Sequence, residues 1–213
     1  MPAAGERPPA TDITHYCDIR TAQEFGQLLW ATGVQRLAEH AKELIFVAEG
    51  ATWIWNLVAE HFPQAVQIVD WYHAVEYIAP IAQALWGQES AQGKAWQEQV
   101  KNDLWKGRFD QVLSTFQTWQ DHPQAGGAAR KAITYYTNNR QRMRYPYFRQ
   151  QGYRIGSGTV ESSCKQIGTQ RLKVAGARWQ LDGARKTAKA RAALLSGQWN
   201  SIVSHFRPAR ALA

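Results

Sequence analysis

A chain of 213 residues, with 45% hydrophobic and 12% aromatic side chains, is long enough to bury the core of one domain, or of one domain that carries an insertion. This composition excludes a disordered tail, and no apolar run approaches the roughly 18 residues of a membrane helix. The first residues, MPAAGERPPATD, lack the basic and apolar stretches of a secretory signal. The two cysteines, Cys17 and Cys164, lack the spacing of a zinc site. We therefore expect free thiols in a cytoplasmic protein.

The net charge of +8 is unevenly distributed along the chain. Residues 1–139 hold 10 Lys and Arg against 15 Asp and Glu, whereas residues 140–191 hold 13 against 2. A block this basic beside an acidic half predicts a polyanionic partner, with nucleic acid first. The alternative is a basic helix face that only meets solvent.

The first half of the sequence predicts a parallel β-α-β unit. After a helix that begins at Thr21, the apolar runs at 44–48 and 65–69 predict two strands buried on both faces. A helix lies between them, and strand, helix and strand in this order are what a parallel pair requires. The residues expected on the buried stripe of that helix are Trp53, Ile54, Leu57, Val58 and His61.

The remainder of the chain predicts helices. Asp70 caps a helix in which Pro80 predicts a kink, and only helical patterns follow over residues 88–150. The large aromatic residues of that region are expected in the core, namely Trp96, Trp105, Phe116 and Trp119. After a Gly-Ser-Gly turn, one helix is expected to bury Val160, Cys164, Ile167 and Val174, and a last helix spans about 181–196.

Three acids suggest phosphoryl-transfer chemistry. Glu49 and Asp70 follow the two predicted strands, and the carboxyl edge of a parallel sheet is where sites form. Glu161 begins a later helix in the basic block. Carboxylates of this kind can hold two Mg²⁺ ions that activate the attacking oxygen of a displacement and stabilise the leaving one. The alternative roles are structural: Asp70 as a helix cap, and Glu161 at a helix start or paired with Lys165.

Two stretches carry a resemblance to a known family. They are GATWIWNLVAEHFPQAVQIVDWYHAVEYI (50–78) and GSGTVESSCKQIGTQRLKVAGARW (156–179). Together they resemble bacterial insertion-sequence transposases of the ISKra type, relatives of the Mutator-like DDE transposases, over about residues 16–197. The resemblance implies an α/β fold: a partial RNase H-like core with a parallel β-α-β unit, interrupted by an all-helical insertion and helix-rich overall.

The resemblance divides the chain into five segments. They are a flexible end at 1–15, a partial RNase H-like core at 16–87, an all-helical insertion at 88–150, returning helices with a basic face at 151–197 and a tail at 198–213.

The family's catalytic set is Asp, Asp and Glu. Glu161 in GTVESS matches the third member, and Glu49 in EGATWI stands where the family has its second Asp. The first Asp is expected on an earlier strand, upstream of this chain, and Asp12 and Asp18 are the nearby acids that could replace it. The extra methylene of Glu49 moves its carboxylate by more than about 1 Å, enough to cost about 100-fold in a preorganised site.

The resemblance also assigns a metal site. Glu49 and Glu161 would bind the Mg²⁺ or Mn²⁺ of a two-metal site, with Asp70 and His73 of the motif DWYH in support. Because the second acid is altered and the first is not found, we expect metal binding here to be weak or absent. The chain is then a truncated or degenerate transposase.

The expected partner is double-stranded DNA, at element ends and targets, for a protein associated with the nucleoid that could form homo-oligomers. The expected phosphate contacts are Lys165, Arg171, Lys173, Arg178, Arg185 and Lys186. The alternative function is a non-catalytic DNA-binding module that regulates the parent element.

Overall fold

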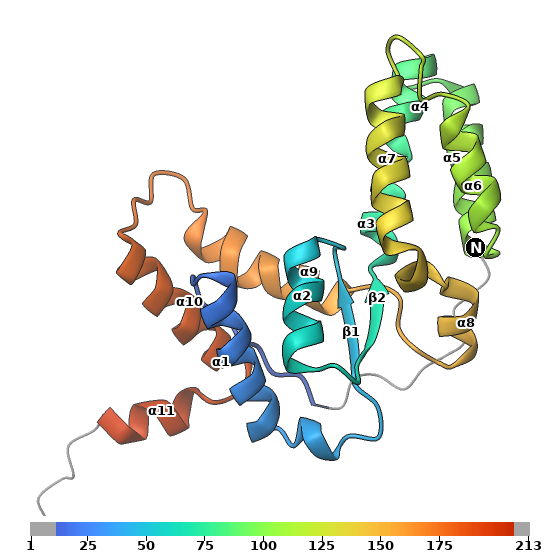
Figure 1. The fold of residues 1–213 in the computed structure, drawn as a ribbon. Helices are drawn as coiled ribbons and strands as arrows, with labels where there is room; N and C mark the ends of the chain where they lie inside the picture. The colour runs from blue at the N-terminus through green and yellow to red at the C-terminus, as the bar shows by residue number, and fades with distance from the viewer. Residues whose placement is uncertain (1–11, 207–213) are drawn as a thin grey trace, which may run out of the picture. The chain divides into compact units, whose positions relative to one another are not determined.

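The computed structural model describes residues 12–206, and its ribbon is shown in Figure 1. The chain forms two compact units. We call Ala41–Ser157 the sheet unit, and Met1–His40 together with Gly158–Ala213 the terminal unit. In the described part of the chain, no helix combines the length and the apolar character needed to cross a membrane.

The sheet unit begins with the predicted β-α-β element. Strands β1 (Ile45–Ala48) and β2 (Val66–Val69) are parallel, with Ile45 opposite Val66, and helix α2 (Thr52–His61) connects them. The prediction of two parallel neighbouring strands is therefore confirmed, with each strand one residue shorter at its start. The chain is helix-rich with a small parallel sheet, which is compatible with the α/β class.

Burial of the two strands differs from the prediction. Ile68 and Val69 of β2 are fully buried, but Ile45 of β1 is 38% exposed and the rest of β1 is half-buried. Strand β2 lies between β1 and the segment η2 (Arg140–Met143), and the Tyr145 hydroxyl donates to the Val69 carbonyl. In residues 12–206, β1 has β2 as its one strand neighbour, so the expectation that β1 is buried on both faces is wrong.

Helix α2 turns a different tryptophan inward from the one predicted. Trp55, Leu57 and Val58 are buried, whereas Trp53 is 48% exposed. Trp53 and Trp55 are two residues apart and point in nearly opposite directions from a helix with 3.6 residues per turn, so only one of them can be buried with Val58.

The predicted interruption at Pro80 is confirmed. Helix α3 (Trp71–Glu76) ends before Tyr77, and α4 (Ala79–Trp86) begins with Pro80 in its first turn. A proline is tolerated there because its missing N–H would have no partner inside the helix.

Four helices of the sheet unit form a bundle (Figure 1). In chain order they are α4, α5 (Ala91–Trp105), α6 (Phe109–Gln117) and α7 (Gly126–Asn139), and each packs against the next, with α7 returning to α4. The short segments η2 and α8 (Tyr145–Gln150) follow. Residues 88–150, all of which are described, contain no strand, so the prediction of a helical region is confirmed.

The large aromatic residues of the bundle pack against other aromatic rings, in the structural role that was predicted. Phe116 is fully buried and meets Tyr136 edge to face. Trp96 and Trp119 are half-buried and both contact Trp86, while Trp105 packs on Trp71. Aromatic pairs at these distances contribute about 0.5–1.5 kcal/mol beyond their buried area.

The described residues of the terminal unit form helices and connecting segments, with no strand among them. Its elements are α1 (Ala22–Gln35), η1 (Ala38–His40), α9 (Gly158–Cys164), η3 (Lys165–Leu172), α10 (Leu181–Leu195) and α11 (Trp199–Phe206). Helix α1 has the predicted Thr21 cap, completed by Glu24 as a capping box. Helix α11 occupies a segment for which a tail was expected.

The buried stripe predicted for residues 160–174 is mostly wrong. Ile167 is buried against Ala188 and Ala192, but Val160, Cys164 and Val174 are exposed. The segment η3 is wound as a π-helix, in which each N–H bonds five residues back. Ile167 lies in η3, whereas Val160 and Cys164 lie in α9 and Val174 follows η3. The change in winding therefore interrupts the spacing of 3.6 residues per turn that would have joined the four residues into one stripe.

Candidate metal centre and nucleic-acid interface

Asp70 follows β2 and is completely buried. One carboxylate oxygen accepts hydrogen bonds from the backbone N–H groups of Tyr72 (2.7 Å) and His73 (3.1 Å), which makes Asp70 the predicted N-cap of α3. The other oxygen accepts the N–H of Ser157. Burial by itself would raise the pKa of Asp70, but the hydrogen bonds from Ser157 and His73 outweigh it and lower the pKa.

His73 is oriented by the same carboxylate. Its Nδ1 lies 3.3 Å from Asp70 Oδ1, and its side chain is 32% exposed. If Nδ1 carries the proton and donates to Asp70, Nε2 keeps a lone pair. A carboxylate behind a histidine in this way fixes the ring and its tautomer in many metal sites. The pair can therefore present one nitrogen ligand.

Glu49 follows β1, and its backbone neighbours that of Asp70. The Asp70 N–H donates to the Ala48 carbonyl at 2.8 Å, so the two acids occupy adjacent strand ends. The structure nevertheless leaves the Glu49 residue exposed while it buries Asp70. The carboxylates of the two strand ends thus have different environments.

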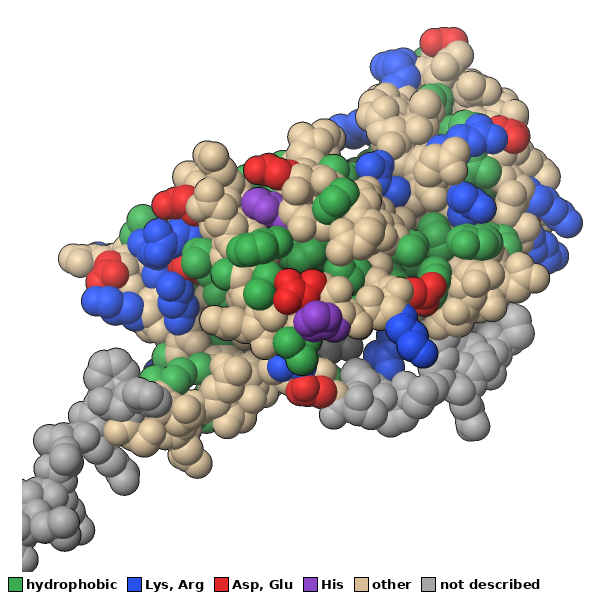
Figure 2. Space-filling view, turned by 60° about the horizontal axis from the view of Figure 1, so that its bottom comes forward, with side chains coloured by type: hydrophobic (Ala, Val, Ile, Leu, Met, Phe, Trp, Pro, Cys, Tyr) green, Lys and Arg blue, Asp and Glu red, His purple; other side chains and the backbone are tan. Residues whose placement is uncertain are grey.

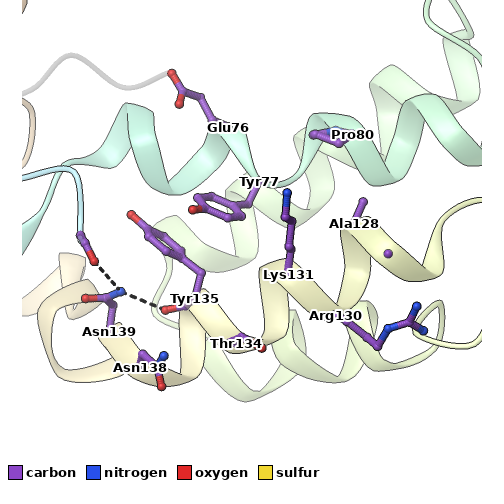
Figure 3. Close-up of a pocket in the computed structure, with 12 residues that line it drawn as sticks. Glu76, Tyr77, Pro80, Ala128, Arg130, Lys131, Thr134, Tyr135, Asn138 and Asn139 are labelled. Atoms are coloured by element: carbon purple, nitrogen blue, oxygen red, sulfur yellow. Dashed lines mark hydrogen bonds between the residues drawn. The ribbon is translucent and has the colours of Figure 1, made fainter. Parts of the chain in front are cut away.

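Helix α7 holds the loop that carries Glu49. The Tyr135 hydroxyl donates to the Glu49 carbonyl at 2.5 Å. The Asn139 amide donates to the Gly50 carbonyl at 3.3 Å, a bond drawn as a dashed line in Figure 3. Gly50 has φ +90°, a backbone conformation that L side chains rarely adopt. No local sequence pattern marks Tyr135 and Asn139, because they lie 86 and 89 residues from their partners.

The side chains of Asp70, His73 and Glu161 are carboxylates and an imidazole, which are groups that can bind a metal ion. Glu161 is exposed in the first turn of α9. A carboxylate has about four acceptor sites, and those of Asp70 are already used by Tyr72, His73 and Ser157. The open ligand of the Asp70–His73 pair is therefore His73 Nε2, with Asp70 behind it.

Neither acid that could replace the first catalytic Asp is free. In the terminal unit, the Asp18 side chain is fully buried and lies 3.0–3.2 Å from Arg20, Arg185 and Lys189. Its burial tends to raise the pKa, but hydrogen bonds from Lys189 and Arg20 lower it well below its ordinary value. Asp12 pairs with Arg36. Both precede α1, in a segment without a strand.

The basic block divides into cations with partners and cations without. Arg185 pairs with Asp18, and Lys186 pairs with Asp182 at 2.6 Å. The other four predicted phosphate contacts are all exposed, and none of them forms an ion pair within residues 12–206. They are Lys165, Arg171, Lys173 and Arg178. These four, which we call the open cations, are the part of the prediction that remains available for an anionic partner.

The first arginines of the basic block (residues 140–191) contact other residues of the sheet unit. Arg140 pairs with Asp110, and the Arg142 guanidinium lies 4.8 Å from the centre of a Trp55 ring. Arg149 covers Trp105 at 3.8 Å. Figure 2 shows acidic side chains (red) as well as basic ones (blue) on the face that it presents.

No protein-family model, curated protein or solved structure matches this chain. Its function therefore has to be argued from the chemistry of its own residues.

Proposed function

We propose that the chain is a DNA-binding protein of the DDE transposase type. The observation that carries the proposal is the juxtaposition of Glu49 and Asp70 at the ends of two parallel strands. A helical region follows them, and Glu161 begins a helix after it. This order of elements and acids is the one that the resemblance implies for an RNase H-like core with a helical insertion.

The proposed metal ligands are Glu49 and Glu161, with Asp70 and His73 in support. When bound, Mg²⁺ or Mn²⁺ would polarise a phosphodiester and activate the attacking oxygen. The protein's part is to orient His73 through Asp70 and to hold the Glu49 loop through Tyr135 and Asn139.

The proposed DNA contacts are the open cations. Four exposed side chains without carboxylate partners can each neutralise a phosphate and release a counterion. Arg185 is engaged with Asp18, so we expect it to contribute less than its position in the sequence suggests.

The second candidate function is a non-catalytic DNA-binding module. The exposed, longer carboxylate of Glu49 favours it, because a site with a misplaced ligand loses in-line geometry. Both candidates require binding to duplex DNA, and they differ in whether a bound strand is cut.

Duplex binding is tested with the full chain and a labelled duplex over a series of salt concentrations. Substitution of Arg171, Lys173 and Arg178 by Gln should flatten the slope of log K against log salt by about 0.9 for each phosphate that the protein no longer neutralises. The matched control replaces three exposed lysines of the sheet unit by Gln, namely Lys42, Lys94 and Lys106. This variant should keep most of the slope of log K against log salt. Equal effects of the two triple variants would contradict the proposed interface.

A further inference from the structure

A groove lies beside the Glu49 loop, inside the sheet unit (Figure 3). It is formed by α3, the start of α4, and α7, and has a volume of about 1040 Å³, enough for a nucleotide. One face of α7 lines it with a cation, a hydroxyl, a phenol ring and an amide at helical spacing: Lys131, Thr134, Tyr135 and Asn138.

Two tyrosine rings form one wall of the groove. Tyr77 and Tyr135 are stacked, with ring centres 4.0 Å apart and planes 14° apart. Both are half-buried, so part of each ring remains accessible. The Tyr135 hydroxyl is bonded to the Glu49 carbonyl, which holds the stack in place and joins this wall to the strand end.

The polar groups of the groove match a nucleotide. Lys131 and Arg130 are exposed cations at its edge, and Glu76 is the one acid among its lining residues. Figure 3 shows Lys131 extending from α7 toward α3. Aromatic rings beside a cation are the combination by which proteins hold unpaired bases, the rings taking the base and the cation its phosphate.

We propose that this groove receives an unpaired nucleotide of DNA next to Glu49. The base lies against Tyr77 and Tyr135, the backbone phosphate meets Lys131, and Thr134 and Asn138 face the base edge. A paired base does not present its π face, so the nucleotide must leave the duplex stack. The inference rests on the proposed function, since it places DNA at the strand ends.

The test compares a labelled duplex with the same duplex carrying a short mismatched bubble, using the full chain. We expect the bubble to bind about tenfold tighter, and Tyr77→Leu or Lys131→Gln to remove that preference while duplex affinity stays unchanged. Tyr77→Phe keeps the ring and should keep the preference. Tyr147→Leu and Lys106→Gln, outside the groove, are the matched controls.

A spectroscopic measurement separates stacking from a merely structural effect. A 2-aminopurine in the bubble should lose fluorescence on binding to the unaltered chain and to Tyr77→Phe, but not to Tyr77→Leu. Equal affinity for bubble and duplex, or a Tyr77→Phe variant as weak as Tyr77→Leu, would overturn the inference and leave the proposed function intact. Failure to bind either DNA would overturn both.

Discussion

Gly50 illustrates how one residue ties the helical bundle to the sheet. Its backbone has φ +90°, and a Cβ at this position would come within 2.5 Å of the Tyr135 hydroxyl and 2.8 Å of its ring. The glycine is therefore required twice, by its conformation and by the close approach of Tyr135.

We expect Gly50→Ala to lower the free energy of unfolding by about 2–4 kcal/mol, because backbone strain and overpacking add. The control is Gly87→Ala, at φ +84° with nothing within 4 Å of the added carbon. Gly87→Ala should lose stability through backbone strain alone, by about 1–3 kcal/mol, and therefore less than Gly50→Ala. Thermal unfolding of the two variants measures the difference, and equal losses would show that Tyr135 does not press on Gly50.

Asp70 is a buried charge that three partners satisfy. Asp70→Asn replaces one accepting oxygen by an NH₂ group and removes the charge, so we expect a loss of about 2–3 kcal/mol at neutral pH.

The pH dependence of Asp70 has a definite sign. Its folded pKa is lowered, so its carboxylate contributes stability that is fully present above the unfolded pKa of about 3.9 and is lost as pH falls through the folded value. The difference in unfolding free energy between the parent chain and Asp70→Asn should therefore shrink in acid below about pH 4. A difference that stays constant from neutral pH into that range would mean that the charge of Asp70 does not act through its hydrogen bonds.

At the scale of elements, Asp18 joins the segment before α1 to helix α10. Its buried carboxylate neutralises Arg185 and Lys189 of α10 as well as Arg20. The three cations keep 26–46% of their side chains exposed, so they can be hydrated if Asp18 is removed.

We expect Asp18→Asn to destabilise the chain by about 1–3 kcal/mol, because charged hydrogen bonds are lost. The same change should tighten duplex DNA binding, since it releases two cations of the basic block. Asp110→Asn removes an exposed pair with Arg140 in the sheet unit and should change stability by less than about 1 kcal/mol. Weaker DNA binding by Asp18→Asn at unchanged fold would contradict a phosphate-facing role for α10.

At the scale of the whole molecule, the prediction concerns strand cleavage. With Mg²⁺ or Mn²⁺, the purified chain should not cut a labelled DNA end, because the Glu49 carboxylate is exposed and is displaced relative to the Asp that the resemblance places there. For the first catalytic position of the resemblance, neither Asp18 nor Asp12 offers an unpaired carboxylate.

The cleavage assay has a built-in control. If the chain does cut DNA, Glu161→Gln should abolish the cut while duplex affinity persists. Cleavage by the unaltered chain would contradict the expected inactivity and support the catalytic over the non-catalytic candidate.

Local chemistry explains what the sequence determined by itself. The caps at Thr21 and Asp70 and the break at Pro80 depend on residues within a few positions of one another. The two strands pair Ile45 with Val66, and their parallel order follows from the helix that connects them. Backbone conformation, capping and the order of elements are set at that range, so patterns of neighbouring residues suffice to predict them.

Only the tertiary structure decided which side chains meet. Asp18 pairs with Arg185 across 167 residues, Tyr135 donates to Glu49 across 86, and Val160 and Val174 are exposed although the sequence pattern predicts them in a buried stripe. Such contacts depend on how separate elements pack, and a one-dimensional pattern does not contain that geometry. The sequence predicted six phosphate contacts alike, but the fold pairs Arg185 with the distant Asp18. Lys186 pairs within α10 with Asp182, and the other four cations are exposed without an ion pair in residues 12–206.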